Sequence, residues 1–258
     1  MSITATVLTL VFIGLTILLS LWQRLGLERD LLIGTIRAAV QLTLVGYVLL
    51  VVFELRDWPY IVLMVMVMIL VAAQNAARRG NQIPQVFWKV LAAITATEVM
   101  AMLVMLGLEI IPPTPQYVIP ISGMVVGNAM IVAGLLLNRL QAEIEAGRQQ
   151  IMVALSLGAT ARQAVLPVLR KTVRAGTIPI IDNLKTVGLV QLPGMMTGLI
   201  IAGVSPEVAV RWQLLIMFSL TAVSAVCAIV LAFLTYPALF TPAHQLREPG
   251  RSRDPAKS

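Results

Sequence analysis

Charged side chains are scarce in the apolar stretches of this sequence, and one of the few, Glu98, lies near the middle of such a stretch. A charge at the centre of a bilayer costs roughly 2.5–3.5 kcal/mol, so those that occur there usually face a protein interior or a water-filled pathway. Glu98 is therefore a candidate cation or proton site. The alternative is structural, with the carboxyl group serving as hydrogen-bond partner to a polar group such as Asn128 or Gln41.

The segment 178–203 concentrates polar and helix-breaking residues. Asp182 and Lys185 are three positions apart and can pair on a helix. Pro193 and Gly194 follow, and this pair predicts a kink or break. Backbone freed by a break is tolerated at membrane depth only inside protein or along a cavity. A gate or translocation pathway is expected, and a kink that only shapes packing is the alternative. The candidate pathway residues are Glu98, Asn128, Asp182, Lys185, Pro193, Gly194, Met195 and Met196, with Glu98 and Asp182 as candidate metal ligands.

Enzyme motifs are missing from the sequence. The single histidine, His244, lies in the C-terminal tail and the single cysteine, Cys227, lies inside an apolar stretch, so we expect no Ser-His-Asp set, Cys-His pair or histidine-rich metal site. There is also no G-x-x-x-x-G-K-[ST] motif through which the chain could bind ATP. We therefore expect no catalytic residues and no cofactor, which favours a transport conduit over an enzyme.

The composition indicates what positions these residues. The chain has 258 residues, of which 59% are apolar and 12% charged, whereas soluble domains are about half apolar and a quarter charged. A membrane-spanning helix needs about 20 apolar residues. Seven segments approach that length, which predicts an all-α, multi-pass membrane bundle: 3–22, 33–53, 58–77, 90–111, 117–137, 178–203 and 209–240.

The basic residues predict an orientation. Fifteen lysines and arginines fall in the first, third and fifth loops and the C-terminal tail, and only Arg56 and Arg211 fall in the other loops. The positive-inside rule then places the N-terminus outside and the C-terminus in the cytoplasm. Basic residues that orient the protein in a bilayer account for the net charge of +7, so we expect no nucleic-acid partner.

Residues 1–240 are expected to form one transmembrane domain, and the Pro-, Arg- and Ser-rich tail 241–258 to be disordered. The long loop 138–177 is predicted to be helical, interrupted at Gly158, with Pro167 kinking or restarting the helix. Such a loop can dock on a partner protein through a small apolar patch. It can equally lie on anionic lipid as an interfacial helix.

Two adjacent stretches carry a family resemblance. They are ALSLGATARQAVLPVLRKTVRAGTIP at 154–179 and IDNLKTVGLVQLPGMMTGLIIAGVSPEVAVRWQLLIMF at 181–218. Together they resemble the FetB-type permeases, membrane subunits of a putative iron-export ABC transporter, a family that also includes plant aluminium-tolerance permeases. The strongest element is D-x-x-K-T-V-G-L-V-x-L-P-G-M-M-T-G, which begins at Asp182.

The resemblance implies a permease in the cell inner (plasma) membrane that forms a homodimer and pairs with a separate cytoplasmic ABC ATPase, which binds the ATP. It also implies that the loop 138–177 holds the helix that couples to this ATPase. The coupling residues would be Ala154, Leu155, Leu157, Gly158 and Ala159. The sequence departs from the usual signature at Met152, where an acidic residue is expected, and at Val153, which replaces an alanine.

Three functions remain in competition. The first is an ABC permease that exports metal, with iron implied by the resemblance alone, or that moves a non-metal solute. The second is a proton-coupled secondary transporter that uses Glu98 or Asp182 as its relay. The third is a scaffold that recruits a soluble ATPase to the membrane.

Overall fold

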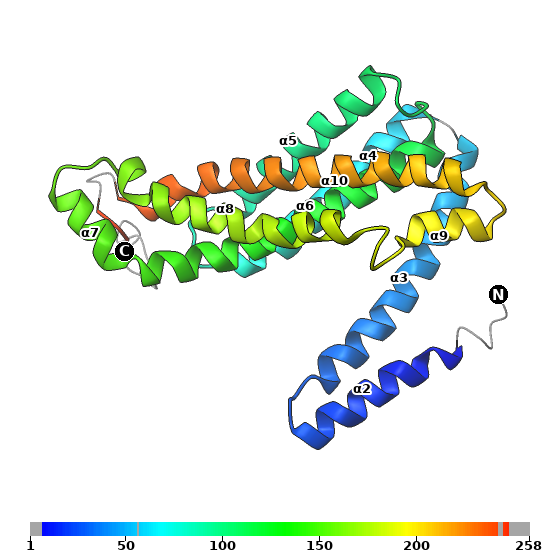
Figure 1. Ribbon diagram of the computed structural model, residues 1–258, viewed down its shortest axis with the longest axis horizontal. Coiled ribbons are helices and arrows are strands. Elements are labelled where there is room, and N and C mark those ends of the chain that lie inside the picture. Colours follow the sequence, from blue (N-terminus) through cyan, green and yellow to red (C-terminus); the bar gives the residue numbers. More distant parts are fainter. Residues whose placement is uncertain (1–6, 56, 242–244, 248–258) are drawn as a thin grey trace, which may run out of the picture. The chain divides into compact units, whose positions relative to one another are not determined.

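A computed structural model describes residues 7–55, 57–241 and 245–247 (Figure 1). The named elements of the described residues are all helices, in agreement with the expected all-α membrane bundle. The chain comprises two compact units, Met1–Asp57 and Trp58–Ser258, each with its own internal packing. Whether residues 1–240 act as the expected single domain stays a prediction.

The first unit is a helical hairpin of α2 (Leu10–Gln23) and α3 (Glu28–Leu55). Arg24 adopts a left-handed conformation that ends α2 and turns the chain. The buried hydroxyl of Ser20 then ties the two helices together. It donates to Glu28 Oε2 at 2.9 Å and accepts from the backbone N–H of Leu27 at 3.1 Å.

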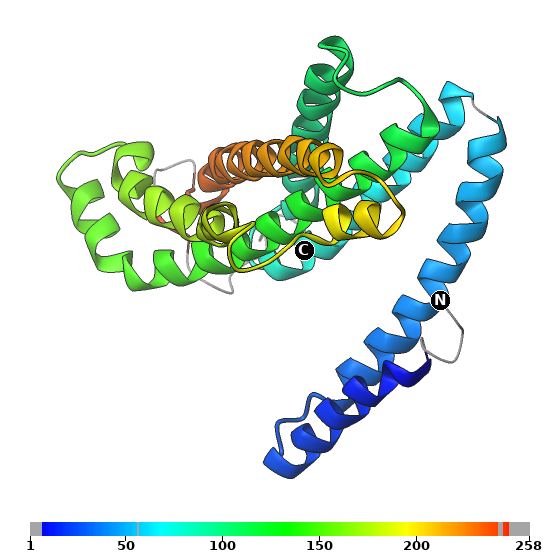
Figure 2. The ribbon, with the colours of Figure 1, turned by 45° about the vertical axis from the view of Figure 1, so that its right-hand side comes forward.

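The second unit is a bundle built around α6 (Figures 1 and 2). Its long helix α6 packs against α4, α5, α8 and α10. The elements are α4 (Trp58–Ala77), η1 (Arg78–Gly80), α5 (Val86–Gly107), α6 (Pro115–Ala146), α7 (Arg148–Ser156), α8 (Ala161–Thr186), α9 (Gly194–Ile201), α10 (Pro206–Thr235) and η2 (Tyr236–Leu239).

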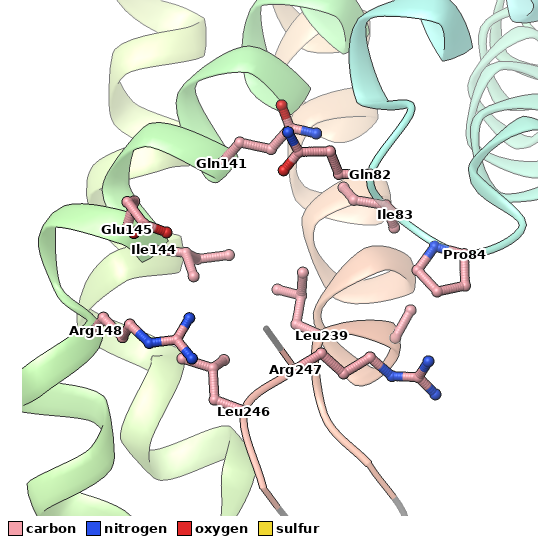
Figure 3. Close-up of a pocket in the computed structure, with 11 residues that line it drawn as sticks. Gln82, Ile83, Pro84, Gln141, Ile144, Glu145, Arg148, Leu239, Leu246 and Arg247 are labelled. Atoms are coloured by element: carbon pink, nitrogen blue, oxygen red, sulfur yellow. The ribbon is translucent and has the colours of Figure 1, made fainter. Parts of the chain in front are cut away.

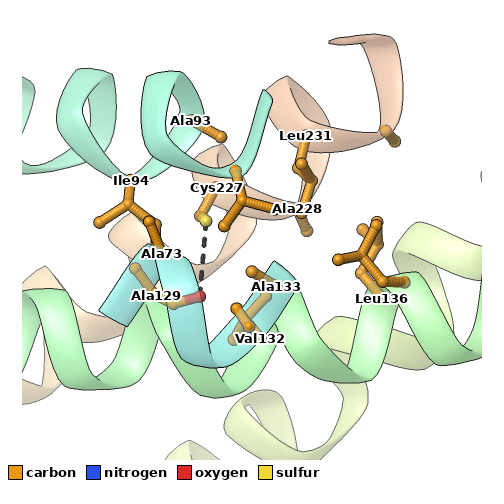
Figure 4. Packing of buried hydrophobic residues seen from close by; sticks show 14 of the residues in the cluster. Ala73, Ala93, Ile94, Ala129, Val132, Ala133, Leu136, Cys227, Ala228 and Leu231 are labelled. Atoms are coloured by element: carbon orange, nitrogen blue, oxygen red, sulfur yellow. Dashed lines mark hydrogen bonds between the residues drawn. The ribbon is translucent and has the colours of Figure 1, made fainter. Parts of the chain in front are cut away.

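Small side chains line the contacts at the centre of this bundle (Figure 4). Ala73, Ala93, Ala129 and Ala228 are fully buried, each on a different helix. Small residues let membrane helices approach closely, and dispersion contacts then replace the hydrophobic driving force that lipid removes. The thiol of Cys227 lies in the same layer, 3.7 Å from the carbonyl oxygen of Ala129.

Five described helices are long and apolar enough to cross a membrane, and they match the second, third, fourth, fifth and seventh predicted segments. The first segment corresponds to the shorter apolar helix Leu10–Gln23, and residues 1–6 lie outside the described part. The sixth is divided between two helices. A total of seven spans and the predicted orientation therefore stay predictions.

The predicted loop 138–177 is helical almost throughout. Helix α6 continues to Ala146 because Leu140 and Ile144 extend the buried stripe of Leu136 and Leu137. Of the two outcomes predicted for Pro167, a restart is contradicted, since α8 runs unbroken from Ala161 to Thr186, and a kink stays a prediction. The restart occurs at Thr160 instead, after the turn at Gly158.

Most of the tail predicted to be disordered lies outside the described residues. Its described part, Thr241 and residues 245–247, returns to the end of η2. Arg247 donates its backbone N–H to the carbonyl of Leu239 at 2.9 Å, and Phe240 pairs with Leu246 in an antiparallel bridge.

Candidate functional site

A sharp corner joins α6, α7 and α8 and holds the predicted coupling residues (Figure 1). Ile151 is buried and anchors α7 to the bundle. Gly158 ends the α7 turn with φ +89°, a conformation that residues with a Cβ rarely adopt. A Cβ at this position would meet nothing within 4 Å, so the backbone conformation, not space, requires glycine.

A capping box fixes the start of α8. Thr160 Oγ1 accepts the backbone N–H of Gln163 at 3.3 Å, and Gln163 Oε1 accepts the backbone N–H of Thr160 at 2.9 Å. Two backbone N–H groups at the first turn of α8 thus have side-chain acceptors. The guanidinium of Arg162 lies 5.6 Å from the ring centre of Phe233 on α10, which fastens the same end of α8 to the bundle.

The corner presents exposed apolar side chains. Met152, Val153 and Leu157 are 53%, 58% and 83% exposed, and Val153 and Leu157 share a face at i,i+4 spacing. Of the predicted coupling residues, Ala154 and Leu155 are instead half-buried against the core, Ala159 is half-buried, and Leu157 and Gly158 are exposed. Met152 and Val153, which depart from the expected signature, therefore belong to the exposed patch. In the sequence, these two residues were compared only with the coupling signature. That comparison does not show which face of the helix they occupy, so their exposure was missed.

The sixth predicted segment is broken, as the Pro-Gly pair indicated, but the break begins earlier. Helix α8 ends at Thr186, residues 187–193 are non-helical, and α9 starts at Gly194 with Pro193 at its N-cap. Gly188, at φ +83°, turns the chain, and its N–H donates to the carbonyl of Gln191 at 2.9 Å. Leu189 and Val190 are 90% and 81% exposed on this connection.

The predicted ion pair of this segment forms. Lys185 Nζ lies 3.2 Å from Asp182 Oδ1, and both side chains are more than half exposed. Beyond the break, Met195 and Met196 are half-buried and Gly194 is exposed. Met195 borders a hollow of about 210 Å³ that is also lined by the stacked rings of Tyr117 and Trp212.

Glu98 lies on the wall of an apolar groove formed by α4, α5 and α6. The groove has a volume of about 580 Å³, and its lining includes Ser122, Met66 and Met102. Glu98 is only 3% exposed and Ser122 is fully buried. Ser122 is the polar neighbour of Glu98, but the two do not reach hydrogen-bond geometry. Neither carboxylate oxygen, nor the Ser122 hydroxyl, has a hydrogen-bond partner among the described residues.

Asn128 is engaged elsewhere. Its amide donates to Ser224 Oγ at 2.6 Å and to the carbonyl of Leu220 at 3.2 Å, both on α10. The structural alternative for Glu98, a hydrogen bond to Asn128, is therefore not observed. Asn128 forms an interhelical clamp between α6 and α10.

A smaller cavity, of about 70 Å³, lies where the ends of α6 and η2 meet the connection before α5 (Figure 3). Gln141, Glu145 and Arg148 lie on one side, and Leu246 and Arg247 approach from the C-terminal segment. No signal in the sequence pointed to this cavity, because its lining comes from three segments far apart in the chain.

The groove around Glu98 does not include Asp182. Within the described residues, no group of three or more His, Cys, Asp or Glu side chains is placed to hold a metal ion. The two candidate metal ligands thus belong to separate places in the bundle, and metal binding at either one stays a prediction.

Comparison with known proteins identifies the family. The uncharacterised protein family UPF0014 matches residues 3–240 of the chain. The UPF0014 membrane protein YjkA of Bacillus subtilis is 46% identical over 93% of this chain and 96% of its own length. The probable iron export permease protein FetB of Escherichia coli is 40% identical over 93% of this chain and 92% of its own length.

A plant relative matches at similar extent. The protein ALUMINUM SENSITIVE 3 of Arabidopsis thaliana is 36% identical over 92% of this chain and 87% of its own length. No solved structure matches. With a match over nearly the whole chain and apolar helices long enough to span a bilayer, this multi-pass membrane protein belongs to the UPF0014 family.

Proposed function

We propose that this chain is the membrane permease subunit of an ABC transporter, driven by a separate cytoplasmic ATPase that docks on the corner at α7. The observation that carries the proposal is the apolar patch of Met152, Val153 and Leu157, presented on a short helix that Ile151 anchors to the bundle. Three exposed apolar residues on a rigid projection suit a groove on a protein partner.

The rigidity of the corner supports a coupling role. Packed helices that move together can carry a motion of the ATPase from the docking helix into the bundle. Helix α7 packs against α8, the capping box at Thr160 and Gln163 holds the first turn of α8, and the contact between Arg162 and Phe233 ties that turn to α10. Helix α8 then continues to the break at residues 187–193, which links the docking corner to the candidate gate by one helix.

The docking contact is apolar and lacks the acidic residue of the usual signature. Met152 stands at that position and is 53% exposed. Arg148 at the start of α7 supplies positive charge that can orient an acidic surface of the ATPase. We therefore expect docking affinity to depend on burial at Leu157 and Val153, and association rate to depend on ionic strength.

The cargo is proposed from the relatives. One is named a probable iron export permease and another is named for aluminium sensitivity, so a metal ion is the first cargo to test, with iron foremost. A non-metal solute is the alternative within the same mechanism. A homodimer of the chain with two ATPase subunits is the assembly proposed.

A second candidate function is a proton-coupled secondary transporter. The buried Glu98 carboxyl group, which lacks a hydrogen-bond partner among the described residues, favours it. The two functions differ in what the chain needs. A secondary transporter moves solute in liposomes with a proton gradient and no ATPase, whereas the permease moves solute only with its ATPase and ATP.

Docking is tested by retention of the ABC ATPase on the immobilised permease in lipid nanodiscs. Leu157→Glu places a charge in the apolar patch and is expected to weaken ATPase binding at least tenfold. Ala142→Glu adds the same charge at an exposed position of α6 outside the patch and serves as the matched control. Equal retention by wild type and Leu157→Glu would refute docking at α7.

A further inference from the structure

The groove between α4, α5 and α6 has a chemical character that the proposed transport function does not explain. Of the residues that line it, only Glu98 is ionisable, and the exposed lining is almost entirely apolar. A site for a hydrated or bare metal ion would need several oxygen, nitrogen or sulfur ligands around one point. This groove offers one carboxylate, and its other polar side chains are the hydroxyls of Ser122 and Thr95.

The Glu98 carboxylate is buried without a hydrogen-bond partner among the described residues. Glu98 is 3% exposed and Ser122 fully buried, and neither has a hydrogen-bond partner among the described residues. A buried charge without a partner is costly, and a cationic ligand that pairs with it removes that cost. The site therefore favours a ligand with one positive charge that also donates a hydrogen bond.

The size of the groove limits the part of the ligand that does not pair with Glu98. Its lining follows α5 from Leu91 to Leu106, about 22 Å at 1.5 Å per residue, with Glu98 near the middle. Its volume of about 580 Å³ is in the range that holds a small organic molecule. Trp58, at the start of α4, also lines the groove and adds an aromatic ring to its apolar wall.

Two flexible methionine side chains share this groove with the carboxylate. Met66 and Met102 line the groove, and methionine rearranges readily because it is unbranched. Met66 is half exposed at the edge of α4. Such side chains can shift to fit a ligand that enters the groove from the apolar surface of the bundle.

We propose that this groove binds an amphipathic organic monocation, a protonated amine with an apolar body, whose ammonium group pairs with Glu98 and Ser122. The ligand approaches from the hydrocarbon region of the bilayer, because the lining that it crosses is apolar. This binding goes beyond the proposed function and requires neither the ATPase nor ATP.

Binding is measured by equilibrium dialysis on the full chain in phosphatidylcholine nanodiscs without ATPase. The probe is 1-adamantylmethylamine, and the neutral 1-adamantanemethanol has nearly the same shape. Protein-free nanodiscs report partition into lipid. We expect saturable amine binding above that background, and at least tenfold weaker binding of the alcohol.

Three variants test the site. Glu98→Gln is expected to weaken amine binding at least tenfold and to leave alcohol binding unchanged. Val99→Trp fills the exposed edge of the groove without changing Glu98 and is expected to weaken both ligands. Glu109→Gln removes an acid of the same helical hairpin outside the groove and should bind the amine as wild type does.

Thermal unfolding of each variant checks that the protein is folded. Amine binding that is equal in wild type, Glu98→Gln and Val99→Trp would overturn the proposal, since it would reflect lipid partition or another site. Equal affinity for the amine and the alcohol would also overturn it, because the carboxylate would then have no part in recognition.

Discussion

Thr160 and Gln163 hold each other at the first turn of α8, with the Thr160 hydroxyl accepting one backbone N–H and the Gln163 side chain accepting the other. The pair lies between the exposed patch of α7 and the long helix that leads to the break at residues 187–193. In the proposed mechanism, this turn is a joint through which a force on α7 passes into α8.

Removing the cap should destabilise this joint. Thr160→Ala leaves the backbone N–H of Gln163 without its acceptor and is expected to lower the free energy of unfolding by about 1 kcal/mol. Thr160→Ser keeps the hydroxyl and should stay close to wild type. Chemical unfolding of the purified protein in detergent measures both, and an alanine variant as stable as the serine variant would contradict a capping role.

The interhelical clamp predicts a measurable coupling. Asn128 donates to Ser224 Oγ at 2.6 Å across α6 and α10. Interhelical hydrogen bonds in membrane proteins contribute about 0.6 kcal/mol on average. A double-mutant cycle of Asn128→Ala and Ser224→Ala should give a coupling energy of roughly 0.5–1.5 kcal/mol. Additive effects of the two substitutions would show that the pair is not an interacting unit.

Close packing at Gly80 predicts sensitivity to one methyl group. A Cβ there would lie 2.9 Å from Val86 Cγ2 and 3.0 Å from Leu137 Cδ1. Valine is stiff at χ1, so its methyl cannot swing away freely. Gly80→Ala is expected to lower the free energy of unfolding by about 1–3 kcal/mol through overpacking.

Gly127 provides the comparison for that substitution. It lies inside α6, and a Cβ would meet nothing within 4 Å. Gly127→Ala should be neutral or stabilise the protein by up to about 1 kcal/mol, because alanine is the better helix former. Equal destabilisation by both alanine variants, measured by unfolding in detergent, would contradict the packing described at Gly80.

Five of the long apolar helices were predictable because length and apolar composition alone determine them. The spacing of Leu136, Leu140 and Ile144 indicates that α6 extends to Ala146. The charged residues between them made this apolar stripe hard to recognise. The continuity of α8 through Pro167 was not predictable, since only tertiary contacts compensate a lost helical hydrogen bond.

The features of the candidate site also differ in whether the sequence predicts them. The ion pair of Asp182 and Lys185 and the break before α9 follow from local spacing and from proline and glycine chemistry. The groove around Glu98 does not, because its lining joins three helices whose mutual packing no local pattern specifies. The partner of Asn128 likewise lies 96 positions along the chain.

The most direct test of the proposed function is ATP hydrolysis by the permease–ATPase complex in lipid nanodiscs. Gly158→Arg changes the corner at a residue with φ +89°, where a side chain is strained, and it sets a bulky charge beside the docking patch. Gly203→Arg is the matched control, since Gly203 has φ +91°, has open space for a Cβ and lies between α9 and α10.

Both variants are first compared with wild type by thermal unfolding, so that loss of fold is distinguished from loss of coupling. We predict that Gly158→Arg lowers the ATPase rate stimulated by the permease at least tenfold, while Gly203→Arg stays within about twofold of wild type. A stimulated rate that is the same in Gly158→Arg and in wild type would contradict the assignment of this corner as the coupling site.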